Sequence, residues 1–106
     1  VTFLGVEGPN DFVVKYDTRT FKELARKAVG RDPHVSLNDE DDFLYLPVQG
    51  SNQVVVLAQE DLSSVNNITV PNAHGAGMRS NGRYFYTTNI LGGGKDGLVG
   101  IDIFGR

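Results

Sequence analysis

The chain repeats itself at an interval of about 40 residues, and this constrains the fold more than any single motif. Two stretches, beginning at His34 and at His74, each contain a histidine, a short apolar segment, a polar turn, an aromatic-rich segment, a polar loop and a valine-rich segment. The two histidines are 40 residues apart, and Tyr45 and Tyr86 are 41 apart. A repeat of this length predicts one supersecondary unit that recurs along the chain and stacks on its neighbours.

A third, incomplete copy precedes these two stretches. The segment Val-Val-Lys-Tyr-Asp ends at Asp17 and matches Val-Val-Val-Leu-Ala, which ends 41 residues later at Ala58. It also matches Leu-Val-Gly-Ile-Asp, which ends a further 44 residues on at Asp102. The three additional residues of the longer interval lie in a glycine-rich loop. The chain therefore holds between two and three units.

The apolar pattern within each unit predicts short antiparallel strands. Residues 43–48 are apolar throughout, as in a strand covered on both faces, and residues 84–88 are types enriched in strands. Asn81-Gly82 predicts a hairpin turn, and the polar run at residues 38–42 takes the equivalent place. Third strands are predicted at residues 53–59 and 97–104, and a fourth strand at residues 65–70.

One segment allows two interpretations. Residues 20–29 carry Phe21, Leu24, Ala25 and Ala28 at helical spacing, in a stretch rich in good helix formers. The repeat instead aligns this segment with residues 65–70, which favours a fourth, outer strand. We expect the strand and keep the helix as the alternative.

A unit of four short antiparallel strands that recurs every 40 residues is typical of a β-propeller blade. We therefore expect an all-β chain that forms one partial propeller domain over residues 1–106. Residues 1–30 would form an incomplete blade of three strands, residues 31–71 a complete blade of four, and residues 72–106 an incomplete blade of three. A ring needs more blades than this, so we expect the chain to be a piece of a longer polypeptide or a subunit completed by other chains.

Composition excludes several classes of function. Ten basic and thirteen acidic residues give a net charge of -3, without the basic cluster that nucleic-acid binding requires. The chain has no cysteine, which excludes disulfides, thiolate catalysis and sulfur-ligated metals. The longest apolar run, residues 54–58, is too short to span a bilayer.

Several motifs resemble the YVTN-type β-propeller repeat. They occur in the family's order, namely Pro33-His34, the turn Ser80-Asn81-Gly82-Arg83, the strand Tyr84-Phe85-Tyr86-Thr87-Thr88-Asn89, and the run Val14-Lys15-Tyr16-Asp17-Thr18. The sequence departs from the family where Asn81 follows Ser80 without proline, where Pro47-Val48 replaces Thr-Asn, and where Ala58 replaces aspartate. The resemblance covers nearly the whole chain and implies a lactonase-like ring of about six to eight blades.

His34 and His74 occupy equivalent positions at the entry to the innermost strands of successive units. Neutral imidazole is a common ligand for transition metals, so histidines from several blades could form a metal site at the central axis, as in copper-containing propellers. The alternative is that each histidine belongs to the repeat itself and hydrogen-bonds backbone where two blades meet.

Two loops are candidates for ligand binding. A flexible loop at the mouth of the ring could reach a ligand, and its residues are Gly92, Gly93, Gly94, Lys95 and Asp96. It is not a phosphate-binding loop, because neither Ser nor Thr follows Lys95. The acidic run at residues 39–42 lacks the pattern of a calcium loop and is interpreted as a solvated hairpin tip.

Asn67-Ile68-Thr69 is a glycosylation sequon in a segment that we place on the outer rim. The site would be accessible if the protein were secreted from a eukaryote. The acidic balance and the absence of lysine-rich tracts favour an extracellular or periplasmic location. Tyr45, Tyr84 and Tyr86 are expected to fill the space between blades rather than to bind sugar.

Three hypotheses of function follow from these patterns. The first is a non-catalytic binding or assembly scaffold that belongs to an extracytoplasmic propeller. The second is part of a lactonase-like or copper-dependent enzyme whose axial site includes His34 and His74. The third is a surface-layer or filament component that assembles through its unpaired blade faces.

Overall fold

The computed structural model of the chain describes residues 1–8, 11–34, 37–38, 43–78, 84–89 and 97–102. Across these residues the regular elements are ten β-strands and one short 3-10 helix, η1(Gln49–Ser51). The prediction of an all-β chain is confirmed. Within the described ranges, no helix is long and apolar enough to cross a membrane.

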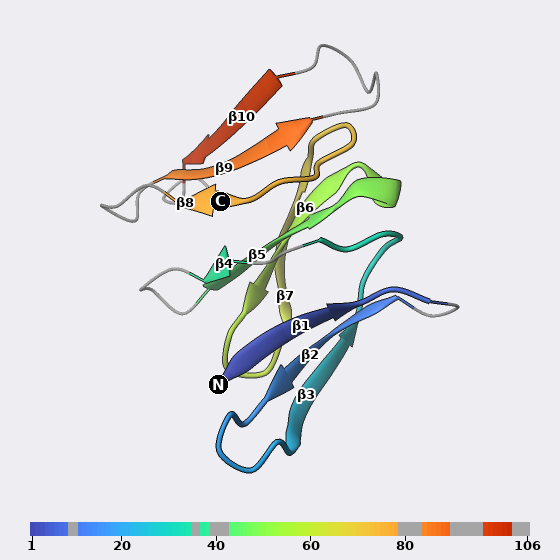
Figure 1. Cartoon of the computed structure of the whole chain (residues 1–106). Coiled ribbons are helices and arrows are strands. Elements are labelled where there is room, and N and C mark those ends of the chain that lie inside the picture. Colours follow the sequence, from blue (N-terminus) through green and yellow to red (C-terminus); the bar gives the residue numbers. More distant parts are fainter. Residues whose placement is uncertain (9–10, 35–36, 39–42, 79–83, 90–96, 103–106) are drawn as a thin grey trace.

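The strands form three antiparallel sheets that are stacked along the molecule, from the blue sheet at the bottom of Figure 1 to the red one at the top. The N-terminal sheet contains β1(Thr2–Val6), β2(Phe12–Tyr16) and β3(Glu23–Ala28). The middle sheet contains β4(Leu37–Asn38), β5(Phe43–Val48), β6(Gln53–Ala58) and β7(Ser64–Thr69). The C-terminal sheet contains β8(Gly77–Met78), β9(Tyr84–Asn89) and β10(Gly97–Asp102). Over the described residues this confirms the prediction of three, four and three strands.

The repeat governs the hydrogen-bonding register as well as the strand positions. The β2–β3 pair carries a register shift between Lys15 and Tyr16, and the β6–β7 pair carries one 41 residues later, between Val56 and Leu57. Strand β1 is displaced by one residue, because the β1–β2 connection is one residue longer than the β5–β6 connection. Residues of β1 therefore correspond to residues of β5 at an interval of 42.

The segment with two interpretations is a strand. Phe21 has a φ of 57°, and this left-handed residue turns the chain so that β3 pairs with β2. Its equivalent, Leu62, has a φ of 61° and turns the chain between β6 and β7. The helix alternative for residues 20–29 is wrong, because the backbone bonds of β3 go to the neighbouring strand and not along the segment.

The sheets bury two apolar layers between them. One layer lies between the N-terminal and middle sheets and includes Val13, Leu46 and Leu62. The other lies between the middle and C-terminal sheets, where the rings of Tyr45 and Phe85 stack with their centroids 5.3 Å apart. The middle sheet is thus covered on both faces, which explains why β5 is apolar at every position.

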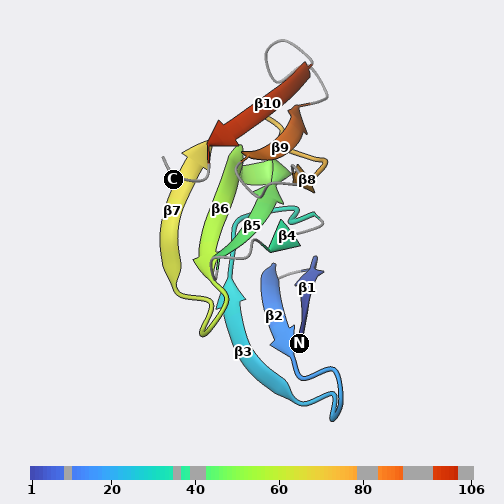
Figure 2. The same ribbon diagram turned by 90° about the vertical axis from the view of Figure 1, so that its left-hand side faces the viewer.

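The side view in Figure 2 separates the two edges of the stack. The short strands β4 and β8 lie along one side, and β3 and β7 lie along the other. The hairpin turn predicted at residues 81–82 falls outside the described residues, as does all but Asn38 of the turn predicted at residues 38–42. The strands that these turns connect are antiparallel as expected. The side that carries β4 and β8 is the one that receives both histidines.

Candidate functional site

Each histidine lies just before a short inner strand and is fixed by the same backbone contact. The His34 N–H donates to the carbonyl of Pro47 at 2.9 Å, and the His74 N–H donates to the carbonyl of Thr88 at 2.9 Å. Each segment that carries a histidine contains a residue with a positive φ two positions before it, Asp32 in the first segment and its equivalent Asn72 in the second. Asp and Asn tolerate this left-handed conformation. The repeat therefore places the two imidazoles at equivalent points of neighbouring sheets, as the sequence predicted.

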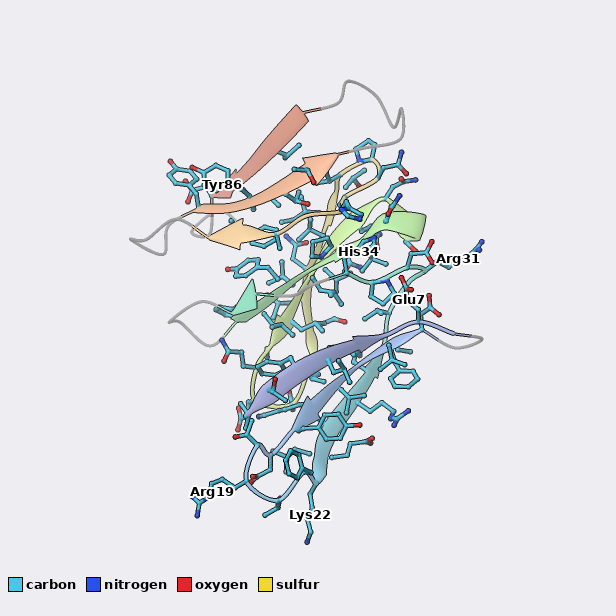
Figure 3. The ribbon with its side chains drawn as sticks, in the orientation of Figure 1. Glu7, Arg19, Lys22, Arg31, His34 and Tyr86 are labelled. Carbon is cyan, nitrogen blue, oxygen red and sulfur yellow. The ribbon has the colours of Figure 1, made fainter. Side chains whose placement is uncertain are left out.

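The two imidazole rings contact each other. Their centroids are 4.1 Å apart and their planes are inclined by 54°. His34, labelled in Figure 3, is half-buried, and its Nε2 lies 2.8 Å from Oε1 of Gln49, while His74 is exposed. A hydrogen on His34 Nε2 therefore bonds to the amide oxygen, and this bond orients the ring at the junction of the sheets.

This pair is a partial donor set for a transition metal. Two imidazoles supply two nitrogen ligands, whereas protein zinc sites use three or four protein ligands. In the part of the chain that the structure describes, no group of three or more His, Cys, Asp or Glu side chains could hold a metal ion. A metal site here would need ligands from outside the described residues.

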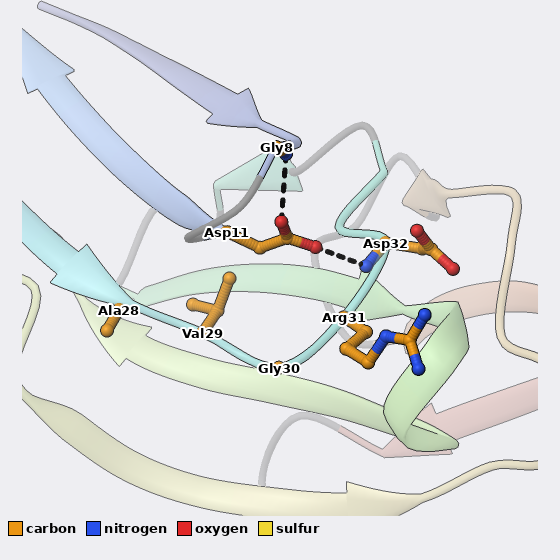
Figure 4. Close-up of a pocket in the computed structure, with 7 residues that line it drawn as sticks. All are labelled: Gly8, Asp11, Ala28, Val29, Gly30, Arg31 and Asp32. Carbon is orange, nitrogen blue, oxygen red and sulfur yellow. Dashed lines mark hydrogen bonds between the residues drawn. The ribbon is translucent and has the colours of Figure 1, made fainter.

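A cavity of about 430 Å³ opens near this junction, where the N-terminal sheet meets the segment that leads into the middle sheet. Its lining includes Gly8, Asp11, Gly30 and Asp32 (Figure 4). The Asp11 carboxylate accepts a hydrogen bond from the Gly8 N–H at 2.9 Å and another from the Asp32 N–H at 2.8 Å. These two N–H donors hold the pKa of Asp11 below its ordinary value of 3.8, and the Asp32 N–H has the larger effect.

The Asp11 contact is a joint between sheets that the next unit repeats. Asn52, 41 residues after Asp11, accepts a hydrogen bond from the N–H of Asn72 through its Oδ1 at 2.9 Å. Asn72 follows Asp32 by 40 residues. Because an amide serves as well as a carboxylate, the joint requires an acceptor oxygen and not an acid. The Asp11 carboxylate and the Asp32 N–H of the cavity are thus already used in joining the sheets.

We expect Asp11→Asn to keep the joint and to reduce the acid sensitivity of the fold. A carboxyl whose pKa is lowered by folding contributes stability above pH 3.8, and that contribution is lost as the pH falls below 3.8 towards the folded-state pKa. Asparagine keeps one acceptor without titrating, whereas Asp11→Ala loses the joint at every pH. Urea unfolding at a series of pH values checks this, and an unchanged pH profile for Asp11→Asn would contradict it.

Sequence reasoning missed both this joint and the contact of Gln49 with His34. The joint leaves a signal in the repeat, because an acid or amide recurs at both of its ends, but the signal becomes meaningful only after the units are aligned. The contact of Gln49 leaves none, because Ile90 occupies the equivalent position of the next unit.

The other predicted site residues have mixed outcomes. Asn67 lies on β7 with its side chain exposed, as a glycan acceptor requires, and Tyr45 is buried in the core as expected. Tyr84 and Tyr86 are half-buried, with their ring centroids 6.2 Å apart. The loop of Gly92, Gly93, Gly94, Lys95 and Asp96 and the acidic run at residues 39–42 lie outside the described residues.

Comparisons of the chain with protein-family models, with curated proteins and with solved structures give no match.

Proposed function

We propose that this chain is a segment of a YVTN-like β-propeller that acts as a binding or assembly scaffold outside the cytoplasm. Consecutive sheets that follow one another at intervals of about 40 residues and cover each other's faces are the arrangement of propeller blades. The observation that carries the proposal is the recurrence at 41 residues of strands, turns and register shifts alike.

The binding role follows from where the exposed connections lie. The packed sheets form a rigid support, and the segments that enter β4 and β8 bring His34 and His74 together on one side of it. Loops carried by a rigid support are the usual place for recognition.

Metal analysis tests the scaffold against an enzyme with an axial metal. The scaffold requires no resident metal, so the purified protein should hold far less than one equivalent of copper or zinc after dialysis against a weak chelator. The comparison is made with the double variant His34→Ala, His74→Ala. One equivalent in the wild type that the double variant loses would contradict the scaffold and establish a metal centre.

The contact of the two imidazole rings supports a second candidate, a transition-metal site completed by residues beyond this pair. The two histidines would then provide two of its nitrogen ligands, and they would bind as neutral rings. On this hypothesis His34→Ala alone removes the metal. Gln49→Ala, which removes the amide that orients His34 Nε2, weakens binding by about 10- to 100-fold, as loss of an outer-shell contact does.

The proposed location predicts that Asn67 is available for glycosylation. Its side chain is exposed on β7, so secretion of this chain from a eukaryotic cell should add one glycan there. Mass spectrometry before and after enzymatic deglycosylation measures the added mass, and Asn67→Gln should abolish it. A secreted, folded wild-type chain without the added mass would contradict the prediction.

A further inference from the structure

The N-terminal sheet carries an apolar face that points away from the middle sheet. Phe3 and Val13 pack towards the middle sheet, so the alternating residues of the same strands point the other way. We call this surface the N-terminal outer face; it comprises Leu4, Val6, Phe12, Val14 and Tyr16, with Phe21 at the adjoining turn. Val14 is fully buried, and the Arg26 guanidinium lies 4.1 Å from the centroid of the Phe12 ring, so Leu4 and Phe21 are the most exposed apolar side chains of this face. Leu4 is 52% exposed and Phe21 is 81% exposed.

The same positions are buried one unit later. Leu46, the equivalent of Leu4, is 0% exposed, and Leu62, the equivalent of Phe21, is 1% exposed, because the N-terminal sheet covers them. The N-terminal outer face thus has the residues of a packed interface but no sheet over it among the described residues. Exposed large apolar side chains such as Leu4 and Phe21 on one face point to an interaction site there.

The C-terminal sheet presents the complementary side. Phe85 and Ile101 pack towards the middle sheet, so Tyr84, Tyr86, Gly100 and Asp102 point away from it, and we call these four the C-terminal outer face. A Cβ atom on Gly100 would lie 3.2 Å from Cε1 of Tyr86, which agrees with a shared face. In Figure 3, Tyr86 lies at the opposite end of the stack from Arg19 and Lys22, which flank Phe21.

We propose that the N-terminal outer face of one copy of this chain docks on the C-terminal outer face of a second copy. This inference rests on the proposed propeller arrangement, because it repeats the contact that already joins successive sheets. Such head-to-tail contacts form a closed ring when the rotations between successive sheets add up to one full turn. Two copies supply six sheets, within the range of about four to eight blades that propellers use.

The repeat identifies which residues would meet. Tyr45 of the middle sheet stacks on Phe85 of the C-terminal sheet. The equivalent of Tyr45 one unit later is Tyr86, and the register of β1 makes Thr2 the equivalent of Phe85 two units earlier. Tyr86 of one copy therefore lies over Thr2 of the next.

Charge favours the same pairing. Lys15 reaches from the N-terminal sheet to the turn of the middle sheet, where its Nζ donates to the carbonyl of Glu60 at 2.9 Å. The equivalent of Lys15 in the C-terminal sheet is Gly100, two residues before Asp102, and the equivalent of Glu60 is Arg19. The turn with Arg19 and Lys22, which also holds the Asp17 carboxylate and so carries one positive charge in excess, would thus lie near Asp102 of the second copy, and this favours the pairing of the two faces.

The native mass of the protein tests the contact directly. For a protein of residues 1–106 alone, we expect a particle of twice the 11.5 kDa of one chain. Phe21→Asp or Leu4→Asp should raise the dissociation constant by at least about 30-fold, the effect of losing an anchor residue of an interface. Val65→Asp is the matched control, because Val65 is also exposed, at 43%, but lies on β7 outside both outer faces, and it should leave the mass unchanged.

Engineered cysteines give a second test in a chain that has none of its own. Equal amounts of Thr2→Cys and Tyr86→Cys are mixed and treated with a bismaleimide cross-linker that spans about 10 Å, because packed sheets lie about that far apart and a direct disulfide cannot reach across them. Head-to-tail docking should give mainly the mixed cross-link. Like-with-like cross-links in the statistical proportion would overturn the proposal.

A folded monomer of the wild-type chain would also overturn the second copy as the occupant. The proposed propeller arrangement would still hold if Tyr45 and Phe85 remain energetically coupled, because their coupling reports only the contact between sheets of one chain. Loss of that coupling would instead reject the propeller arrangement. The two failures are therefore distinguishable.

Discussion

Leu62→Ala should lower the free energy of unfolding by about 2 to 5 kcal/mol, whereas Phe21→Ala at the equivalent turn should change it by less than about 0.5 kcal/mol. Leu62 is 1% exposed and packs in the layer between the N-terminal and middle sheets. Phe21 is 81% exposed. The two residues share a left-handed φ, so the backbone cost of substitution is common to both and the difference reports burial alone.

Urea unfolding of dilute protein, below the concentration at which copies would associate, measures both variants. Val65→Ala serves as the control for an exposed apolar residue on the middle sheet. Equal losses for Leu62→Ala and Phe21→Ala would mean that the N-terminal sheet does not cover the middle sheet, and the stacked arrangement would then be wrong.

The strands could be predicted from the sequence because two independent signals agree. Residues 43–48 are apolar throughout and residues 84–88 are β-branched or aromatic, and both lie where the repeat requires a strand. In residues 20–29 the signals conflict, since local propensity favours a helix and the repeat favours a strand. The structure follows the repeat, because β3 gains backbone bonds to β2 and packs Ala25 on the apolar layer.

The candidate site could be predicted only in part. The equivalence of His34 and His74 was visible in the sequence, but the contact of their rings depends on the rotation between neighbouring sheets, which no local pattern encodes. The Asp11 joint depends on pairing with a backbone N–H, and a backbone donor has no identity in the sequence. The one-residue displacement of β1 was also not predicted, because it follows from the length of one connection.

Tyr45→Leu and Phe85→Leu should each destabilise the protein, and the double variant should lose about 0.5 to 1.5 kcal/mol less than the sum of the single losses. The two rings stack across the layer between the middle and C-terminal sheets, and both side chains are fully buried. Full truncation, as in Phe85→Ala, should cost about 3 to 5 kcal/mol, a large part of the stability of a small domain.

The control cycle pairs Tyr45→Leu with Val13→Ala. Val13 lies in the other apolar layer, on the opposite face of the middle sheet, so these two losses should add within about 0.5 kcal/mol. Coupling in the first cycle and additivity in the second mean that each layer is a separate contact between neighbouring sheets. Additivity in both cycles would mean that the C-terminal sheet does not pack on the middle sheet, and with that contact the propeller, its axial histidines and the head-to-tail docking would all be rejected together.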